Sequence, residues 1–194
     1  MNTKYGRRGW TIIEVAVVLL VLMLLVGILL PAFSTRGCRI NSRQIKDATQ
    51  VRDIVQAMTI FANGNRDQYP LPSKLDIDNA TVAEAGEAKD TTADILSILI
   101  FNSSISPELC VSPAEASGSI RVDVGYQNTK PDAAVIPSAA LWDPAFSGDF
   151  TSVEGGNLSY ATLQTSEQRR AQWSNTFNAT EAVFGNRGPE IASY

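Results

Sequence analysis

The feature that most constrains this chain is an apolar run close to its N-terminus. Residues 15–33 carry no polar side chain, and at a rise of ~1.5 Å per residue a helix of that length crosses a hydrocarbon core of ~30 Å. Lys4, Arg7 and Arg8 precede the run, and basic flanks stay on the cytoplasmic side of a membrane. The sequence therefore predicts a transmembrane helix over residues 10–33, with the rest of the chain outside the cytoplasm.

Other kinds of N-terminal segment fit this run less well. A cleaved secretory signal has an apolar stretch of only ~7–15 residues and a small-x-small cleavage site, whereas the apolar run here is longer and LPAFSTRGC follows. A twin-arginine export signal meets the same objection. A plain single-span anchor explains the length of the run and leaves its details unexplained.

Those details are a glycine, an aromatic residue, a carboxylate and a proline at particular positions. Gly9 lies between the basic residues and the large aromatic Trp10, and Glu14 is the only charged residue between Arg8 and Arg36. An acid in a spanning segment costs up to ~3 kcal/mol at mid-membrane and less near the interface. Proline inside a helix costs ~3 kcal/mol. Taken singly, Glu14 in the headgroup layer or a proline that ends the span is ordinary, but the combination is specific.

Together these residues resemble the N-terminal signal of bacterial type IV pilins and type II secretion pseudopilins. The resemblance implies that a prepilin peptidase removes a leader, residues 1–9, by cutting between Gly9 and Trp10. It implies N-methylation of Trp10, an assembly role for Glu14 as the fifth residue of the mature chain, and a helix kink at Pro31. The family usually has phenylalanine where this chain has Trp10. The resemblance covers about 30 residues, in which spacing, charge and proline agree.

The resemblance implies a structural subunit of a type IV pilus-like filament or a type II secretion pseudopilus, and not an enzyme. Its partners would be other pilin-like subunits, the prepilin peptidase, an inner-membrane assembly platform and membrane lipid. The chain would reside in a bacterial inner membrane and then in a filament in the periplasm or at the cell surface. Two alternatives remain: a membrane-anchored extracytoplasmic binding domain, and a minor pilin with a ligand-binding role.

A second helical pattern follows the apolar run. Apolar residues recur at spacings of 3 or 4 between residues 45 and 62, and the pattern stops at Asn63-Gly64. This predicts an amphipathic helical spine over residues 34–63 that continues the membrane helix, and an extracytoplasmic globular domain over 64–194. The apolar face of the predicted spine consists of Ile45, Ala48, Val51, Val55, Met58 and Ala62.

The remainder of the chain indicates short elements joined by long loops. A helix capped by Asp90 or Thr91 is predicted to run through Phe101. Alternation of apolar and polar residues predicts a half-buried strand over 120–126, and weaker strand patterns occupy 157–163 and 182–184. A small helix capped by Ser166 is predicted over 166–173. The fold class is therefore α+β, and the resemblance implies a pilin-like arrangement with a long N-terminal helix packed on a small antiparallel sheet. Trp142, Tyr160 and Trp173 are predicted to be core residues.

The composition excludes several kinds of chemistry. Histidine is absent, which removes the usual general base near neutral pH and the commonest metal ligand. The sequence contains no phosphate-binding glycine loop, nucleophile elbow or HExxH motif. The formal net charge is −4, and because residues 1–9 hold three basic residues and no acid, residues 10–194 carry 13 basic and 20 acidic side chains, a balance of −7. This outer part lacks the basic face that nucleic-acid binding requires. We expect neither catalysis nor nucleic-acid binding.

Two further groups of residues are weaker candidates for a site. Asp143, Asp149 and Glu154 lie in one loop; their spacing matches no EF-hand, so a solvated acidic loop is favoured over a calcium site, and no cofactor is predicted. The two cysteines, Cys38 and Cys110, are a candidate disulfide in an oxidising compartment. Free thiols are the favoured interpretation, because Cys38 lies only seven residues beyond the proline and close to the membrane.

Overall fold

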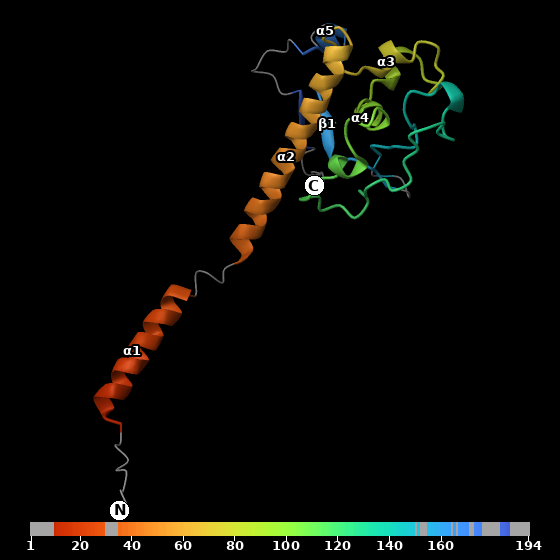
Figure 1. Ribbon diagram of the computed structural model, residues 1–194. Helices are drawn as coiled ribbons and strands as arrows, with labels where there is room; N and C mark the ends of the chain where they lie inside the picture. Colours follow the sequence, from red (N-terminus) through yellow and green to blue (C-terminus); the bar gives the residue numbers. More distant parts are fainter. Residues whose placement is uncertain are drawn as a thin grey trace, which may run out of the picture. The chain divides into compact units, whose positions relative to one another are not determined.

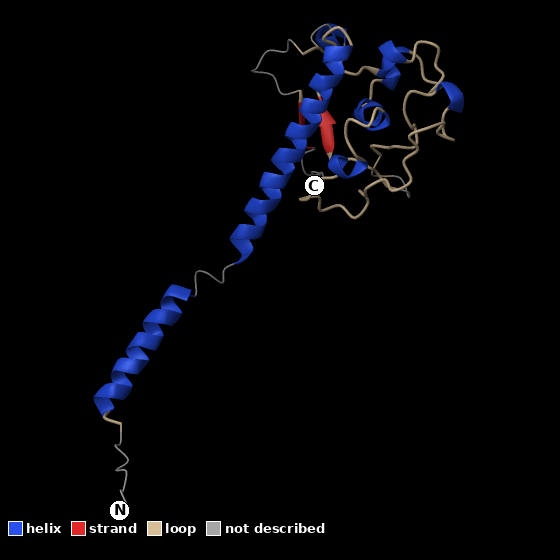
Figure 2. Ribbon diagram, viewed as in Figure 1, coloured by secondary structure: helices blue, strands red, loops and turns tan. Residues whose placement is uncertain are grey.

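The computed structural model describes residues 10–29, 35–149, 151, 155–163, 165, 167–170, 173–175 and 183–186. The chain divides into two compact units, Met1–Ser42 and Arg43–Tyr194 (Figure 1). Helices and irregular segments make up most of what is described, with a small amount of strand (Figure 2). The fold is α+β, as the sequence predicts.

The N-terminal unit contains helix α1, Ile12–Leu29. A second helix, α2, spans Thr35–Gly64. Residues 30–34, which include the predicted kink at Pro31, lie outside the described residues, so the continuation of the membrane helix into the spine stays a prediction. Among the described residues, no helix combines the length and apolar character needed to cross a membrane.

Helix α2 enters the core of the second unit through its C-terminal half. Ile54, Ala57, Met58 and Ala62 are all at most 4% exposed, at the 3–4 spacing of one helix face. The prediction of an amphipathic helix here is confirmed. The buried part of the apolar face begins later than predicted. Ile45, the first residue of the predicted face, is 66% exposed, because the face is buried only where the globular unit covers it.

The predicted helix before Phe101 is confirmed as α4, Thr92–Phe101. Thr91 is the N-cap residue, and its side-chain hydroxyl accepts a hydrogen bond from the backbone N–H of Asp94 at 3.1 Å. Ile95 through Ile100 are all buried, so α4 is the central helix of the unit. Its apolar residues form one core cluster with the buried face of α2, together with Tyr69, Leu71, Ile105, Cys110, Phe146, Leu158, Tyr160, Trp173 and Phe184.

The sheet of this unit is small and antiparallel, as predicted. Strand β1, Tyr160–Thr162, pairs with β2, Phe184–Asn186, with Ala161 opposite Gly185. Strand β1 confirms the prediction over 157–163, and β2 begins at the last residue of the predicted strand 182–184. Trp142, Tyr160 and Trp173 are 0–2% exposed, so the prediction that these aromatic residues belong to the core is also confirmed.

The predicted strand over 120–126 is wrong. Ile120 makes a single parallel bridge to Gly156, and Val124 is 97% exposed. The Asp123 carboxylate accepts a hydrogen bond from the Gly125 N–H at 2.9 Å, which folds the backbone into a local turn. Alternation identifies a strand only when a neighbouring strand is present to pair with it, and here none of the described segments supplies one beyond that bridge.

A buried ion pair organises the loop between α2 and α4. This loop contains α3, Pro72–Leu75, and the 3₁₀ turn η2, Gly86–Lys89. Lys89 Nζ lies 3.0 Å from Asp76 Oδ2, and both side chains are at most 2% exposed. The Asp76 carboxylate also accepts from the backbone N–H groups of Ala80 and Thr81. Burial acts to raise the pKa of Asp76, but these hydrogen bonds and the Lys89 charge together lower it below its usual value.

Short elements complete the unit. The 3₁₀ turns η3 and η4 span Pro107–Cys110 and Pro137–Ala139, and helix α5 spans Glu167–Arg170. Helix α5 lies within the predicted small helix over 166–173; Ser166, its predicted cap, lies outside the described residues. Arg170 Nη1 makes an ion pair with Glu87 Oε1 at 2.6 Å, which connects α5 to η2.

We predict that Gly155→Ala destabilises the globular unit by about 1–3 kcal/mol. Gly155 has a φ of +80°, and a Cβ there would lie 2.1 Å from the backbone oxygen of Ser119. Backbone atoms cannot move aside as a flexible side chain does. The matched control is Gly118→Ala, where a Cβ meets no atom within 4 Å. Urea unfolding of the two variants measures the difference; equal midpoints would show that this turn tolerates a side chain.

Candidate functional site

The first turn of α1 contains a reciprocal pair of hydrogen bonds between Thr11 and Glu14. The Thr11 backbone N–H and hydroxyl donate to Glu14 Oε2 at 2.9 and 3.1 Å, and Thr11 Oγ1 accepts from the Glu14 N–H at 3.3 Å. This is a capping box, in which a Thr at the N-cap and a Glu three residues later satisfy each other's backbone donors. It holds the Glu14 carboxylate at the positive end of the helix dipole.

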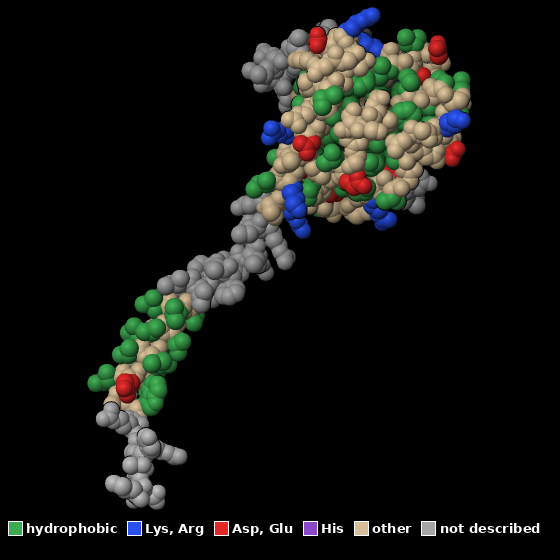
Figure 3. Space-filling model, in the orientation of Figure 1, with side chains coloured by type: hydrophobic (Ala, Val, Ile, Leu, Met, Phe, Trp, Pro, Cys, Tyr) green, Lys and Arg blue, Asp and Glu red, His purple; other side chains and the backbone are tan. Residues whose placement is uncertain are grey.

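The rest of α1 presents apolar side chains on every side. All its residues through Gly27 are exposed, with large hydrophobic side chains between 44% and 89% exposed, and Figure 3 shows hydrophobic side chains along this helix. Burial of apolar area is worth about 25 cal/mol per Å². The helix has no polar face, so along its described length its apolar surface is unburied.

Of the other residues predicted for the N-terminal site, the structure describes Trp10 alone. Trp10 directly precedes the cap and is 73% exposed. Gly9 and Pro31 lie outside the described residues. The structure thus brings together Thr11 and Glu14, and Trp10 precedes Thr11 in the chain. The sequence analysis did not assign Thr11 a role, although Thr-x-x-Glu before an apolar run is the sequence signal of a capping box.

Of the two cysteines, the structure describes the side chain of Cys110. Cys110 is a free thiol with no exposed surface, and burial raises its pKa to about 12, with a smaller contribution from the charge of Glu108. A thiol in this environment is unreactive. The side chain of Cys38 lies outside the described residues, so a disulfide between Cys38 and Cys110 stays a prediction.

The two described carboxylates of the acidic loop, Asp143 and Asp149, each accept local hydrogen bonds. Asp143 is 2% exposed and accepts hydrogen bonds from the backbone N–H groups of Gln127 and Ala145, each at 2.9 Å. Asp149 accepts from the N–H and hydroxyl of Thr151 at 2.8 and 2.6 Å, and Glu154 lies outside the described residues. Within the described part of the chain, no cluster of three or more acids or cysteines is arranged to hold a metal ion.

A polar cluster that sequence reasoning missed joins α2 to the globular unit. Asp47 Oδ1 accepts hydrogen bonds from the hydroxyls of Ser112 and Tyr160 at 2.5 and 3.0 Å, and from Asn186 Nδ2 at 3.2 Å. The Tyr160 hydroxyl also lies 2.9 Å from Gln50 Oε1. Burial, followed by the neighbouring Asp47 carboxylate, raises the pKa of Tyr160. The helical pattern placed Asp47 and Gln50 on the solvent face, and no local signal indicates otherwise.

Comparisons of the chain with protein families, with curated proteins and with solved structures found no match.

We predict that Asp47→Ala destabilises the second unit by about 1.5–3 kcal/mol, because hydrogen bonds to a charged acceptor are worth that much and three donors lose theirs. Asp53→Ala is the matched control on the same helix, because the Asp53 side chain makes no hydrogen bond or ion pair with another described residue. We expect its free energy of unfolding to change by no more than ~0.5 kcal/mol. Urea unfolding followed by tryptophan fluorescence reports on the unit, since Trp142 and Trp173 lie in its core. If both variants unfold at the wild-type midpoint, the Asp47 cluster is not an anchor for α2.

Proposed function

We propose that this chain is a structural subunit of a type IV pilus-like filament or type II secretion pseudopilus, processed by a prepilin peptidase and polymerised through its N-terminal helix. The observation that carries the proposal is the start of α1: an apolar helix, exposed on all sides, with one carboxylate held in its first turn. Such a helix needs an apolar partner along its length and a positive partner at its N-terminal end.

Lipid and neighbouring subunits are the proposed partners along the helix. Before assembly, residues 10–33 lie in the bilayer, and in the filament the same helices pack on one another. The second unit supports the proposal that only α1 needs outside partners, because α2 buries its own apolar face in that unit. The second unit therefore meets the requirement for apolar burial within one chain, and α1 does not.

A positive partner for Glu14 arises from the proposed cleavage. Cutting between Gly9 and Trp10 creates an ammonium group at Trp10, next to the cap of the helix. Glu14 Oε2 is occupied by Thr11, and Oε1 makes no hydrogen bond with another described residue. Oε1 is thus available to the Trp10 amine of a neighbouring subunit. An ion pair in apolar surroundings costs several kcal/mol to leave broken, so it sets the axial register between subunits.

Processing tests the first step of the proposal. We expect the full chain, produced together with a prepilin peptidase and extracted from membranes, to begin at N-methylated Trp10 by intact mass and N-terminal sequencing. Without the peptidase it is expected to begin at Met1. A chain that starts at Met1 in both cases, or is cut beyond Pro31, would contradict the proposal and favour an anchored extracytoplasmic domain.

The capping box allows the charge of Glu14 to be separated from its structural role. Glutamine at the third helical position also completes a capping box, so Glu14→Gln keeps the cap and removes the charge. We expect this variant to be processed normally and to lose at least about 90% of filament assembly, corresponding to a tenfold or greater effect from ~1.4 kcal/mol or more. The measurement is sheared filament yield by immunoblot.

The matched control for this substitution is Thr11→Val, which removes the side-chain cap and leaves the carboxylate. A lost cap costs ~1 kcal/mol of helix stability, and we expect assembly within about threefold of wild type. If Thr11→Val abolishes assembly and Glu14→Gln supports it, the carboxylate acts as a helix cap and the intersubunit ion pair is wrong.

A further inference from the structure

The outward side of α2 carries an exposed stripe with apolar ends. We define the α2 stripe as the exposed residues at 3–4 spacing opposite the buried face of the helix, with Lys46 beside them: Ile45, Thr49, Arg52, Gln56 and Ile60. Ile45 and Ile60 are each 66% exposed. Lys46 and Arg52 form no ion pair with a described residue. Asp53, at the margin of the stripe, is only partly exposed.

A second exposed apolar surface surrounds η4. We define the η4 patch by its apolar residues Ile77, Val135, Ile136 and Leu141, which are between 39% and 77% exposed. Backbone hydrogen bonds hold them together: the Val135 N–H donates to the Thr81 oxygen at 3.1 Å and the Ile136 N–H to the Ala80 oxygen at 2.7 Å. Leu141 N–H donates to Thr81 Oγ1 at 3.0 Å. Apolar side chains on a rigid support resemble the core of a protein interface.

Acidic residues flank the η4 patch. Asp78 follows Ile77 in the chain, Asp132 precedes Val135 by three residues, and Glu84 lines the same surface pocket as Val135. All three are exposed, and none forms an ion pair with a described residue. Among the described residues close to this set in the chain, Lys74 and Lys130 are the exposed basic side chains, and Lys89 is buried in its ion pair with Asp76. Three exposed acids against two exposed bases leave the rim of the patch acidic on balance. Its charge is opposite to that of the α2 stripe.

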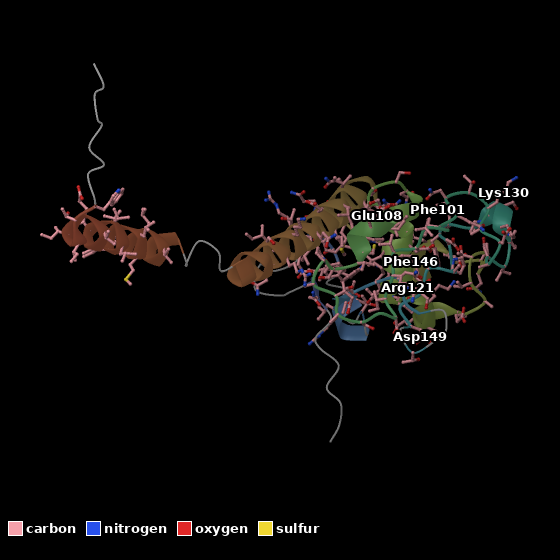
Figure 4. The ribbon with its side chains drawn as sticks, turned by 90° about the horizontal axis from the view of Figure 1, so that it is seen from below. Phe101, Glu108, Arg121, Lys130, Phe146 and Asp149 are labelled. Atoms are coloured by element: carbon pink, nitrogen blue, oxygen red, sulfur yellow. The ribbon has the colours of Figure 1, made fainter. Side chains whose placement is uncertain are left out.

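The two surfaces lie on opposite sides of the second unit. In Figure 1, α2 runs along one edge of this unit and the teal turn of η4 lies at the other. Figure 4, turned by 90°, agrees: Lys130 and the teal turn lie at the end of the unit farthest from α2. Two complementary surfaces on opposite sides of one molecule make a heterologous contact, which repeats from copy to copy instead of closing into a dimer.

We propose that the α2 stripe of one subunit binds the η4 patch of a second copy of this chain, as a lateral contact between the globular units of the filament. This rests on the proposed function, which it deepens. Apolar ends of the stripe meet the apolar patch, and Lys46 and Arg52 face the acidic rim. The N-terminal helices then supply adhesion along the filament axis, while the contact between stripe and patch orients the globular units around it.

Zero-length cross-linking of the unaltered chain tests the contact directly. Carbodiimide joins an amine to a carboxylate with which it is in contact, so Lys46 is expected to couple to Asp78, Glu84 or Asp132. Processed full-length protein labelled with ¹⁵N is mixed with unlabelled protein before assembly. Mass spectrometry of mixed-isotope peptides then identifies links between different copies. Absence of such links from Lys46 would overturn the proposal.

Charge reversal tests whether the two surfaces recognise each other. The stripe-reversed variant is Lys46→Glu with Arg52→Glu, and the patch-reversed variant is Asp78→Lys with Asp132→Lys. Each variant by itself places like charges opposite one another at the contact. We therefore expect at least about a tenfold lower yield of the intersubunit link between stripe and patch. In both variants this yield is measured with a photo-cross-linker placed at Gln56. In a one-to-one mixture of the two variants, every contact between a stripe-reversed and a patch-reversed copy has opposite charges. We expect the yield of the link to return to within about twofold of wild type.

The matched control is Arg66→Glu with Arg169→Glu, two exposed arginines outside both surfaces, whose yield should stay within about twofold of wild type. A mixture that stays as low as its components would overturn the contact, as would a control that falls equally. These outcomes are independent of cleavage before Trp10 and of Glu14→Gln. If processing is normal and filaments depend on Glu14 but contain no stripe-to-patch links, the contact alone is refuted. If stripe-to-patch links form between chains that the peptidase does not process, the filament function alone is refuted.

Discussion

The burial of one face of α2 is the contact on which the globular unit depends. Ile54 and Met58 have no exposed surface and share one cluster with the apolar residues of α4 and with Tyr160 of β1. A two-stranded sheet of three residues per strand is not stable by itself, so it needs the helices as its support. Because Asp47 of α2 accepts hydrogen bonds from Ser112, Tyr160 and Asn186, polar contacts fix the same helix about two turns before Ile54.

This arrangement separates two helices with opposite requirements. The apolar face of α2 is covered within the second unit, while the described side chains of α1 are exposed. The proposed role in a filament follows from that difference. The capping box adds a second requirement, because it holds a carboxylate at a helix terminus surrounded by apolar side chains. In the proposed filament, a positive group from outside the helix balances this charge, and its attraction to the carboxylate offsets the cost of desolvation.

Long-range polar contacts were the part of the molecule that sequence patterns could not predict. Asp76 and Lys89 are 13 residues apart and read as ordinary loop charges, yet they form a fully buried ion pair. Asp47 sits in a helical pattern as a solvent-facing acid and is instead the acceptor for three side chains from distant segments. Conversely, alternation over 120–126 indicated a strand, but Val124 is almost fully exposed because no described neighbouring segment pairs with it.

The sequence by itself determined the local features of this protein. The helical period from Val51 to Ala62, the cap at Thr91 and the aromatic core residues were all readable, since each depends on neighbours three or four residues away or on side-chain hydrophobicity. It also determined the apolar N-terminal segment with its single acid. Only the tertiary structure decided which charges are buried, which acid anchors α2, and which apolar side chains remain outside the core. Those outcomes depend on contacts between segments that are tens of residues apart in the chain. Local sequence patterns do not show which of these segments come into contact.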